Sequence, residues 1–239
     1  MMFKKYLHII LFSTTAFATS CNQTTVREMV ENMSEYTKQT IDKIYGTIPD
    51  SVRNKVFVQF DDAIKMPDKV YNIDVSNSSL SSVPEYLPEF KELESLNLSS
   101  NKLSRMPESV TKLKKVKYLN LENNKVDKIP ESVYNMVELK VLKLNSNKID
   151  TLPESLGYLE SLEELYLNDN KIEQIPNSFG KLKKLKRLSI GSNKIKILPQ
   201  CFETMQNLEY LDLSNLYLDS MEEQKLNITS KLPRTRIIW

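Results

Sequence analysis

The sequence predicts an α/β solenoid: a horseshoe with a parallel concave β-sheet of about seven strands and short convex helical or 3₁₀ segments, capped at both ends. The first observation is a 23-residue period that sets five asparagines at equal steps: Asn101, Asn124, Asn147, Asn170 and Asn193. The second is a proline that keeps the same step: Pro84, Pro107, Pro130, Pro153, Pro176 and Pro199. The third is the L-x-x-L-x-L-x-x-N-x-L pattern around each asparagine. Because the register survives without insertions, we expect similar units stacked in a row.

Residues 1–20 have the features of an export signal. Two lysines precede an apolar run from Tyr6 to Phe12, which is too short to cross a membrane as a helix. Residues 16–18 fit an A-x-A cleavage site, whereas residues 18–21 resemble a lipobox that would leave Cys21 as the lipid attachment site. We therefore expect an exported outer-membrane or cell-surface lipoprotein, held at the membrane by a lipid anchor on Cys21. The alternatives are a soluble secreted or periplasmic protein and an uncleaved anchor.

Residues 21–69 are predicted to form an N-terminal amphipathic helix and cap. Apolar side chains recur at helical spacing over residues 22–46. This helix has three alternative uses: it docks on the first repeat, pairs with another helix, or lies on the membrane beside a lipid anchor. Further along, the alternating positions Val56, Val58 and Phe60 are apolar, which predicts a short capping strand.

Residues 70–218 are predicted to form seven repeats of one strand, one turn and one convex segment. Two apolar positions two residues apart indicate a strand with one buried face, as at Leu96 and Leu98. Downstream, pairs such as Val133 and Met136 have helical spacing, and they follow a proline that suits the first position of a helical turn. The repeats begin at these apolar positions: Val70, Leu93, Val116, Leu139, Leu162, Leu185 and Leu208.

The repeated asparagines are predicted to be structural. The chain bends inward after each strand and leaves backbone N–H and C=O groups away from water. An amide side chain offers both a donor and an acceptor, so stacked asparagines can tie neighbouring turns together. The slot holds Ser78 in the first repeat and Leu216 in the last, because terminal repeats lack one neighbour.

The repeats resemble leucine-rich repeats of the L-P-x-S type, which occur in Ras-suppressor-like and many bacterial proteins. The resemblance covers about residues 70–231 and rests on four segments: Met106 to Ser109, Ile129 to Ser132, Leu152 to Ser155 and Ile175 to Ser178. The entry from Ala63 to Ser76 is similar to that of Bacteroidetes-type leucine-rich-repeat lipoproteins. In that group a helix and a short strand follow the last repeat. The resemblance thus implies a C-terminal cap over residues 219–239, with a helix at Met221 to Lys231 and a strand at Thr235 to Trp239, whose Trp239 covers the open core.

Composition argues against catalysis. The only histidine, His8, lies in the predicted signal, so the mature chain has no imidazole for acid–base chemistry or metal binding. Four glycines leave no phosphate-binding loop. Cys201 stands where other repeats have serine, and is either a small packing residue or a reactive thiol. We predict no enzyme, no cofactor and no metal site.

Charge argues against nucleic acid as a partner. The formal charge of +2 falls to zero when residues 1–20 are removed, because two lysines leave and 31 basic residues then balance 31 acidic ones. No basic run is interleaved with aromatic residues. A lysine follows each asparagine, and this column forms either a solubilising edge or a site for an anionic surface: Lys102, Lys125, Lys148, Lys171 and Lys194.

Function is therefore expected on the concave sheet, through strand residues that point away from the core. Three tyrosines lie at these positions, and tyrosine is a good interface anchor because it buries much area and loses little rotamer entropy. Strand propensity alone also explains tyrosine there. The predicted partner-binding residues are Tyr118, Tyr166, Tyr210, Asn97, Asn120, Lys143, Glu164, Arg187 and Asp212.

The leading hypothesis is a monomeric, non-enzymatic protein-interaction module of a bacterial cell envelope, which binds a protein through its concave face. The alternative is a structural or adhesive surface protein that binds host matrix or glycan multivalently. An effector enzyme similar to bacterial leucine-rich-repeat ubiquitin ligases is disfavoured, because those carry a separate catalytic domain beyond the repeats.

Overall fold

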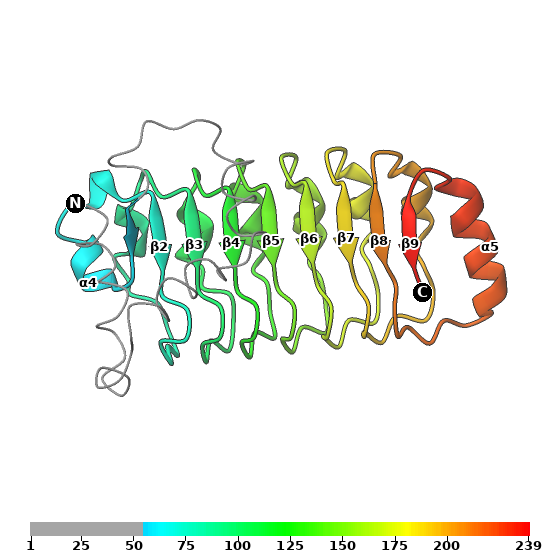
Figure 1. Cartoon of the computed structure of the whole chain (residues 1–239), viewed down its shortest axis with the longest axis horizontal. Coiled ribbons are helices and arrows are strands. Elements are labelled where there is room, and N and C mark those ends of the chain that lie inside the picture. The colour runs from blue at the N-terminus through cyan, green and yellow to red at the C-terminus, as the bar shows by residue number, and fades with distance from the viewer. Residues whose placement is uncertain (1–54) are drawn as a thin grey trace, which may run out of the picture.

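A computed structural model describes residues 55–239, which form one elongated solenoid (Figure 1). Its nine strands make one parallel sheet in chain order. From β2 to β8 each strand pairs with the one 23 residues further along, as Leu96 does with Leu119. The predicted signal, Cys21 and the amphipathic helix over residues 22–46 lie outside the described residues. The strands are β1 (Val56–Phe57), β2 (Asn72–Asp74), β3 (Ser95–Asn97), β4 (Tyr118–Asn120), β5 (Val141–Lys143), β6 (Glu164–Tyr166), β7 (Arg187–Ser189), β8 (Tyr210–Asp212) and β9 (Arg236–Ile238).

The sheet forms because each strand from β2 to β8 buries its central side chain and turns its outer two away from the core. Leu96, Leu119 and Leu142 are fully buried. Large side chains from the opposite side of the stack meet them, among them Phe179 and Phe202. One continuous core therefore runs the length of the sheet, and its burial is the main source of stability.

The convex segments are short 3₁₀ helices. In the later repeats the proline precedes the helix in an extended conformation, as Pro130 does with φ −71° and ψ 149°, so the predicted first helical position is wrong for these repeats. This placement suits a one-turn segment, because the turn closes on the proline carbonyl, which accepts the Val133 N–H at 3.0 Å. The segments are η1 (Pro67–Lys69), η2 (Leu87–Glu89), η3 (Val110–Lys112), η4 (Glu131–Asn135), η5 (Glu154–Tyr158), η6 (Asn177–Lys181) and η7 (Gln200–Thr204).

The N-terminal end is closed by β1 and helix α4 (Phe60–Ala63). The predicted alternation of Val56, Val58 and Phe60 is wrong: β1 is two residues long, Val56 is 44% exposed and Phe57 is buried. The physical reason is register, because Phe57 pairs with core-facing Ile73. Phe60 is buried, but as the first residue of α4.

The C-terminal end is closed by helix α5 (Met221–Lys231) and by β9, which joins the same sheet (Figure 1). Helix and strand lie where the resemblance implied them. The core is covered by Ile228 and Leu232, which are 3% and 2% exposed. Trp239 was expected in this role, but it is 37% exposed and lies at the margin with the Lys225 ammonium 5.5 Å from its ring centroid. Among the described residues, no helix is long and apolar enough to cross a membrane.

Candidate binding face

The predicted binding residues all lie at outward positions of the strands, on what we call the concave face. Strand pairing sets them in two rows that cross the sheet. One row follows the first residue of each strand and aligns Tyr118, Glu164, Arg187 and Tyr210. The other row follows the third residue and aligns Asn97, Asn120, Lys143, Tyr166 and Asp212.

Six of these side chains form a connected group, which we call the aromatic–cation array: Tyr118, Lys143, Tyr166, Glu164, Arg187 and Tyr210. The Lys143 ammonium lies 5.8 Å from the Tyr118 ring centroid and 5.6 Å from that of Tyr166. The Arg187 guanidinium lies 5.8 Å from the Tyr210 ring centroid. These distances are within the range of cation–π attraction. Cations on β5 and β7 therefore alternate with tyrosines on β4, β6 and β8.

Glu164 joins the two halves of the array. Its carboxylate accepts a hydrogen bond of 2.7 Å from the Tyr166 hydroxyl. The same carboxylate lies 3.9 Å from Arg187 Nε. Burial lowers the pKa of Lys143, while the carboxylates of Glu122 and Glu164 act in the opposite direction. The array is thus a set of charged and aromatic groups already held in contact with one another.

The amide and carboxyl residues of the face differ from the array, because their oxygens also hold the turns that follow the strands. Asn97 and Asn120 each accept the backbone N–H of the residue two positions on, at 3.1 and 2.9 Å. Asp212 does the same for Ser214 at 3.0 Å. Asn120 and Asp212 are 7% and 9% exposed, so little of either side chain remains for a partner.

Two residues of the face were missed by the sequence analysis. Asn168 donates to Asp212, two repeats away, at 2.9 Å and accepts the Gly191 N–H at 2.8 Å. Gly191 permits this close packing, because a Cβ there would lie 2.7 Å from the Ser214 carbonyl oxygen and 3.2 Å from Asp212 Oδ1. The signal for this feature is a glycine in a column that otherwise carries polar side chains.

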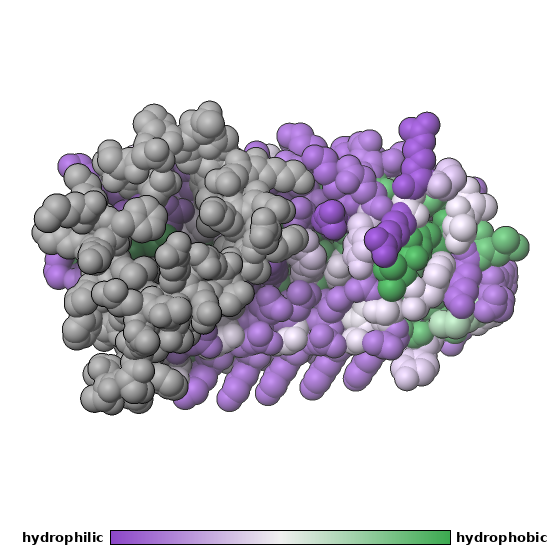
Figure 2. All heavy atoms as spheres, in the orientation of Figure 1, coloured by the Kyte–Doolittle hydropathy of each residue, from purple (hydrophilic) through white to green (hydrophobic). Residues whose placement is uncertain are grey.

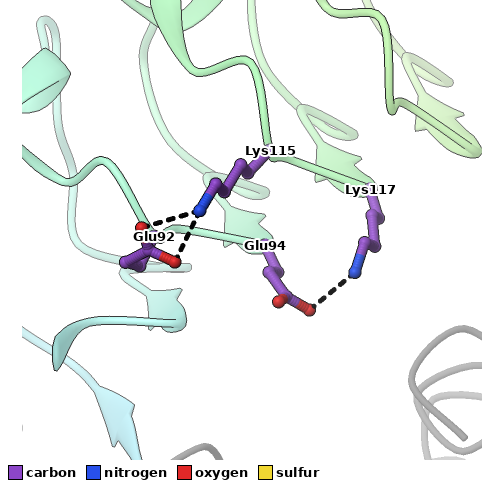
Figure 3. A network of polar contacts seen from close by, with 4 residues as sticks. All are labelled: Glu92, Glu94, Lys115 and Lys117. Carbon is purple, nitrogen blue, oxygen red and sulfur yellow. Dashed lines mark hydrogen bonds and ion pairs between the residues drawn. The ribbon is translucent and has the colours of Figure 1, made fainter. Parts of the chain in front are cut away.

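The edge of the sheet where the strands begin carries ion pairs between adjacent repeats, and we call it the strand-entry rim. Figure 3 shows Lys115 donating to both carboxylate oxygens of Glu92 at 2.7 Å, beside a 3.0 Å pair between Lys117 and Glu94. A hydrogen bond with Glu92 raises the pKa of Lys115. Further along, Lys186 pairs with Glu163 at 2.8 Å, and this hydrogen bond raises the pKa of Lys186. Unlike charges in successive repeats therefore neutralise this rim.

The described residues offer little reactive chemistry. They contain no group of three or more histidine, cysteine, aspartate or glutamate side chains placed to hold a metal ion. Burial raises the pKa of the Cys201 thiol, and its sulfur lies 3.7 Å from the Pro176 carbonyl oxygen. A thiol that retains its proton is a poor nucleophile.

Comparison with known proteins gives consistent matches to one kind of repeat. Residues 68–126 match a family model described as leucine rich repeat, and residues 130–237 match one described as leucine-rich repeat region. None of the curated proteins that were compared matches the sequence.

Solved structures of bacterial proteins share the fold. A leucine-rich-repeat protein of Leptospira interrogans has 33% identity and a TM-score of 0.70 over 74% of this chain. An internalin of Listeria monocytogenes has 26% identity and a TM-score of 0.65 over 75% of this chain. The chain spans 44% and 50% of these two proteins. Internalin C2 of the same bacterium has 23% identity and a TM-score of 0.59 over 69% of this chain and 68% of its own length. At this identity the match shows the shared fold alone.

Proposed function

Because the chain belongs to the leucine-rich-repeat family, we propose that it is a non-enzymatic protein-binding module of a bacterial cell envelope, which holds its partner on the concave face. Leucine-rich repeats are in general interaction scaffolds. Here they provide a rigid sheet whose outward side chains are fixed by register. A partner bound to such a surface loses little free energy to ordering of the receptor.

The aromatic–cation array is the observation that carries the proposal. Its tyrosines lie on alternate strands, which are about 9.6 Å apart, twice the usual strand spacing. Tyr118 and Tyr210 lie in one row of the face and Tyr166 in the other. Tyrosine presents a large amphipathic surface, and Arg187 is also of a residue type common in interface hot spots. We infer that the tyrosines supply most of the affinity, while Lys143, Glu164 and Arg187 supply charge specificity. Asn97, Asn120 and Asp212 hold the strand ends in position beneath the partner.

A role at the envelope is supported by the N-terminal sequence. The export signal over residues 1–20 and lipid attachment at Cys21 would place the solenoid on a membrane surface, and the structural neighbours include internalins. We propose a monomer, since one face of the sheet is sufficient for one partner.

The test is a crosslinking pull-down from envelope and host-cell extracts with the full chain and two triple variants. The first replaces Tyr118, Tyr166 and Tyr210 by serine. The matched control replaces three exposed tyrosines away from the concave strands, Tyr134, Tyr158 and Tyr217, which are 51%, 52% and 77% exposed. Both variants exchange three phenol side chains for hydroxymethyl groups, so they differ only in location.

A partner captured by the unaltered chain and the control but lost from the concave variant would support the proposal. We expect the dissociation constant of that partner to rise by at least about 100-fold, since hot-spot truncations cost about 2 kcal/mol or more each. Equal capture by all three proteins would exclude the concave face as the binding surface. Circular dichroism of both variants checks that the fold is retained.

A further inference from the structure

Five lysines form a second surface on the opposite edge of the sheet, where the strands end. We call Lys102, Lys125, Lys148, Lys171 and Lys194 the lysine row. All five are exposed. Figure 2 shows hydrophilic side chains projecting as a regular series from this edge, the lower one in Figure 1. At the usual strand spacing of about 4.8 Å, the row spans about 19 Å.

The backbone of the lysine row is fixed in place. Each lysine N–H donates to a carbonyl oxygen of the preceding repeat, for example Lys148 to Val126 and Lys171 to Ile149, both at 2.8 Å. The asparagine just before each lysine adds its own bonds to the same turn. The ammonium groups can move on their stems, but their attachment points are held one repeat apart by these backbone hydrogen bonds.

The two rims of the sheet differ in whether their lysines are paired with carboxylates. On the strand-entry rim, lysines such as Lys115 and Lys186 each find a carboxylate in the preceding repeat. In the lysine row the same sign recurs five times, and among the described residues no carboxylate lies within 4.0 Å of any of the five ammonium groups. Neighbouring like charges repel one another, so this arrangement does not stabilise the fold.

The region of positive charge along the row is narrow. Three of the lysines are followed, two positions later in the chain, by an acidic residue that borders the row on its convex side: Asp127, Asp150 and Glu173. Toward the concave side, the residues just before the asparagines are neutral except for Asp169: Ser100, Asn123, Ser146 and Ser192. A flat anionic surface would meet these acids as well as the lysines, whereas a thin chain laid along the row would meet mainly lysines.

We propose that the lysine row is a binding site for a linear polyanionic glycan, a polysaccharide with regularly spaced sulfate or carboxylate groups. Such a chain would lie along the rim, across the repeats, and replace like-charge repulsion with one charge-assisted contact per repeat. The site is independent of the concave face and of whatever protein binds there. It fits the alternative role of a multivalent adhesive protein, because many weak contacts add along one chain.

The test measures binding of fluorescein-labelled heparin fragments to the purified full chain by anisotropy, over a range of salt concentrations. The row variant replaces all five lysines of the row by glutamine. The matched control replaces five exposed lysines elsewhere, for which the structure gives no carboxylate partner: Lys69, Lys91, Lys112, Lys114 and Lys183. Each variant changes the formal charge from +2 by five units to −3, so only the position of the lost charge differs.

We expect heparin to bind the unaltered chain and the control, with an affinity that falls as salt rises because binding releases counterions. The dissociation constant of the row variant should rise by at least about tenfold, with a shallower salt dependence. The Tyr118, Tyr166 and Tyr210 triple variant should bind heparin normally.

Three results would overturn the proposal. The first is absence of heparin binding to the unaltered chain. The second is an equal loss in the row variant and the control, which would indicate net charge alone. The third is row-dependent binding to vesicles of phosphatidylcholine with 30% phosphatidylglycerol, without binding to heparin or hyaluronan, which would identify a membrane surface instead.

Discussion

At the scale of single residues, the repeated asparagine shows how one side chain stabilises two repeats at once. The Asn170 amide nitrogen donates to the carbonyl of Leu144 in the preceding repeat, at 2.9 Å, and to that of Leu167 in its own, at 3.0 Å. Its amide oxygen accepts the Ile149 N–H at 3.0 Å. Backbone groups that no water reaches are therefore paired through a side chain.

Replacement of Asn170 by alanine should lower the free energy of unfolding by roughly 1–3 kcal/mol, because it leaves buried backbone groups without a partner. Urea denaturation followed by circular dichroism measures the change. Lys171→Ala is the control, since this neighbouring side chain is exposed and its loss should cost no more than about 0.5 kcal/mol. Equal effects of the two substitutions would mean that the amide is dispensable.

The sequence predicted the positions of the binding residues on the concave strands but not the use of each side chain. At the third strand position a short polar side chain can face a partner or accept the N–H two residues on. Asn97, Asn120 and Asp212 take the second option. Both roles select the same residue types, so spacing alone does not separate them. A tyrosine side chain cannot accept the backbone N–H two residues on. The sequence alone therefore assigned the tyrosines more specifically to partner binding.

At the scale of elements, the convex segments pack most closely where a glycine meets the next repeat. A Cβ added to Gly157 of η5 would lie 2.4 Å from the Ser178 carbonyl oxygen in η6. Because the obstacle is backbone, the two segments would have to separate to admit a side chain.

Gly157→Ala should therefore lower the thermal unfolding midpoint, with a loss of stability of about 1–3 kcal/mol as for other overpacked sites. Gly180→Ala, one repeat on, is the matched control. There the nearest atom is the Thr204 hydroxyl oxygen at 2.8 Å, which can rotate away. Differential scanning calorimetry of both variants should rank Gly157→Ala as the more destabilising. The reverse order would contradict the packing described for η5 and η6.

The repeats were predictable from sequence to within a residue or two, because five asparagines set the register. The ends were less so. Strand β1 has two residues, which is too short for alternation to show which side chain faces the core. At the other end, the space that Trp239 was expected to fill is occupied by Ile228 and Leu232, whose placement depends on how α5 docks.

At the scale of the whole molecule, the solenoid has two edges and a sheet face with different properties. Each repeat bonds chiefly to its neighbours, so stability is close to a sum of similar local terms. Charge is neutralised between repeats on the strand-entry rim and accumulates on the lysine row. The sequence could place the lysines in a column, but the absence of carboxylates around them among the described residues required side-chain positions.

Lipid attachment at Cys21 stays a prediction, because that residue lies outside the described part of the chain. We expect bacteria grown with an alkyne analogue of palmitate to label the unaltered protein and to carry it in the membrane fraction. Cys21→Ser should abolish both, since only a cysteine thiol is acylated at this position. Cys201→Ser is the control and should retain both, because Cys201 lies in η7 of the solenoid. Labelling that persists in Cys21→Ser would contradict lipid attachment at Cys21.

The constant 23-residue step has a consequence for how the protein can evolve. An in-frame tandem duplication of one repeat would create a unit whose apolar positions, asparagine and lysine already match those of both flanking copies. The protein could thus gain or lose whole repeats in a single genetic event, without selection for a new core. Each event would change the reach of the sheet and the number of charges on its rim together. Length variation among strains would then act as a heritable setting of binding strength.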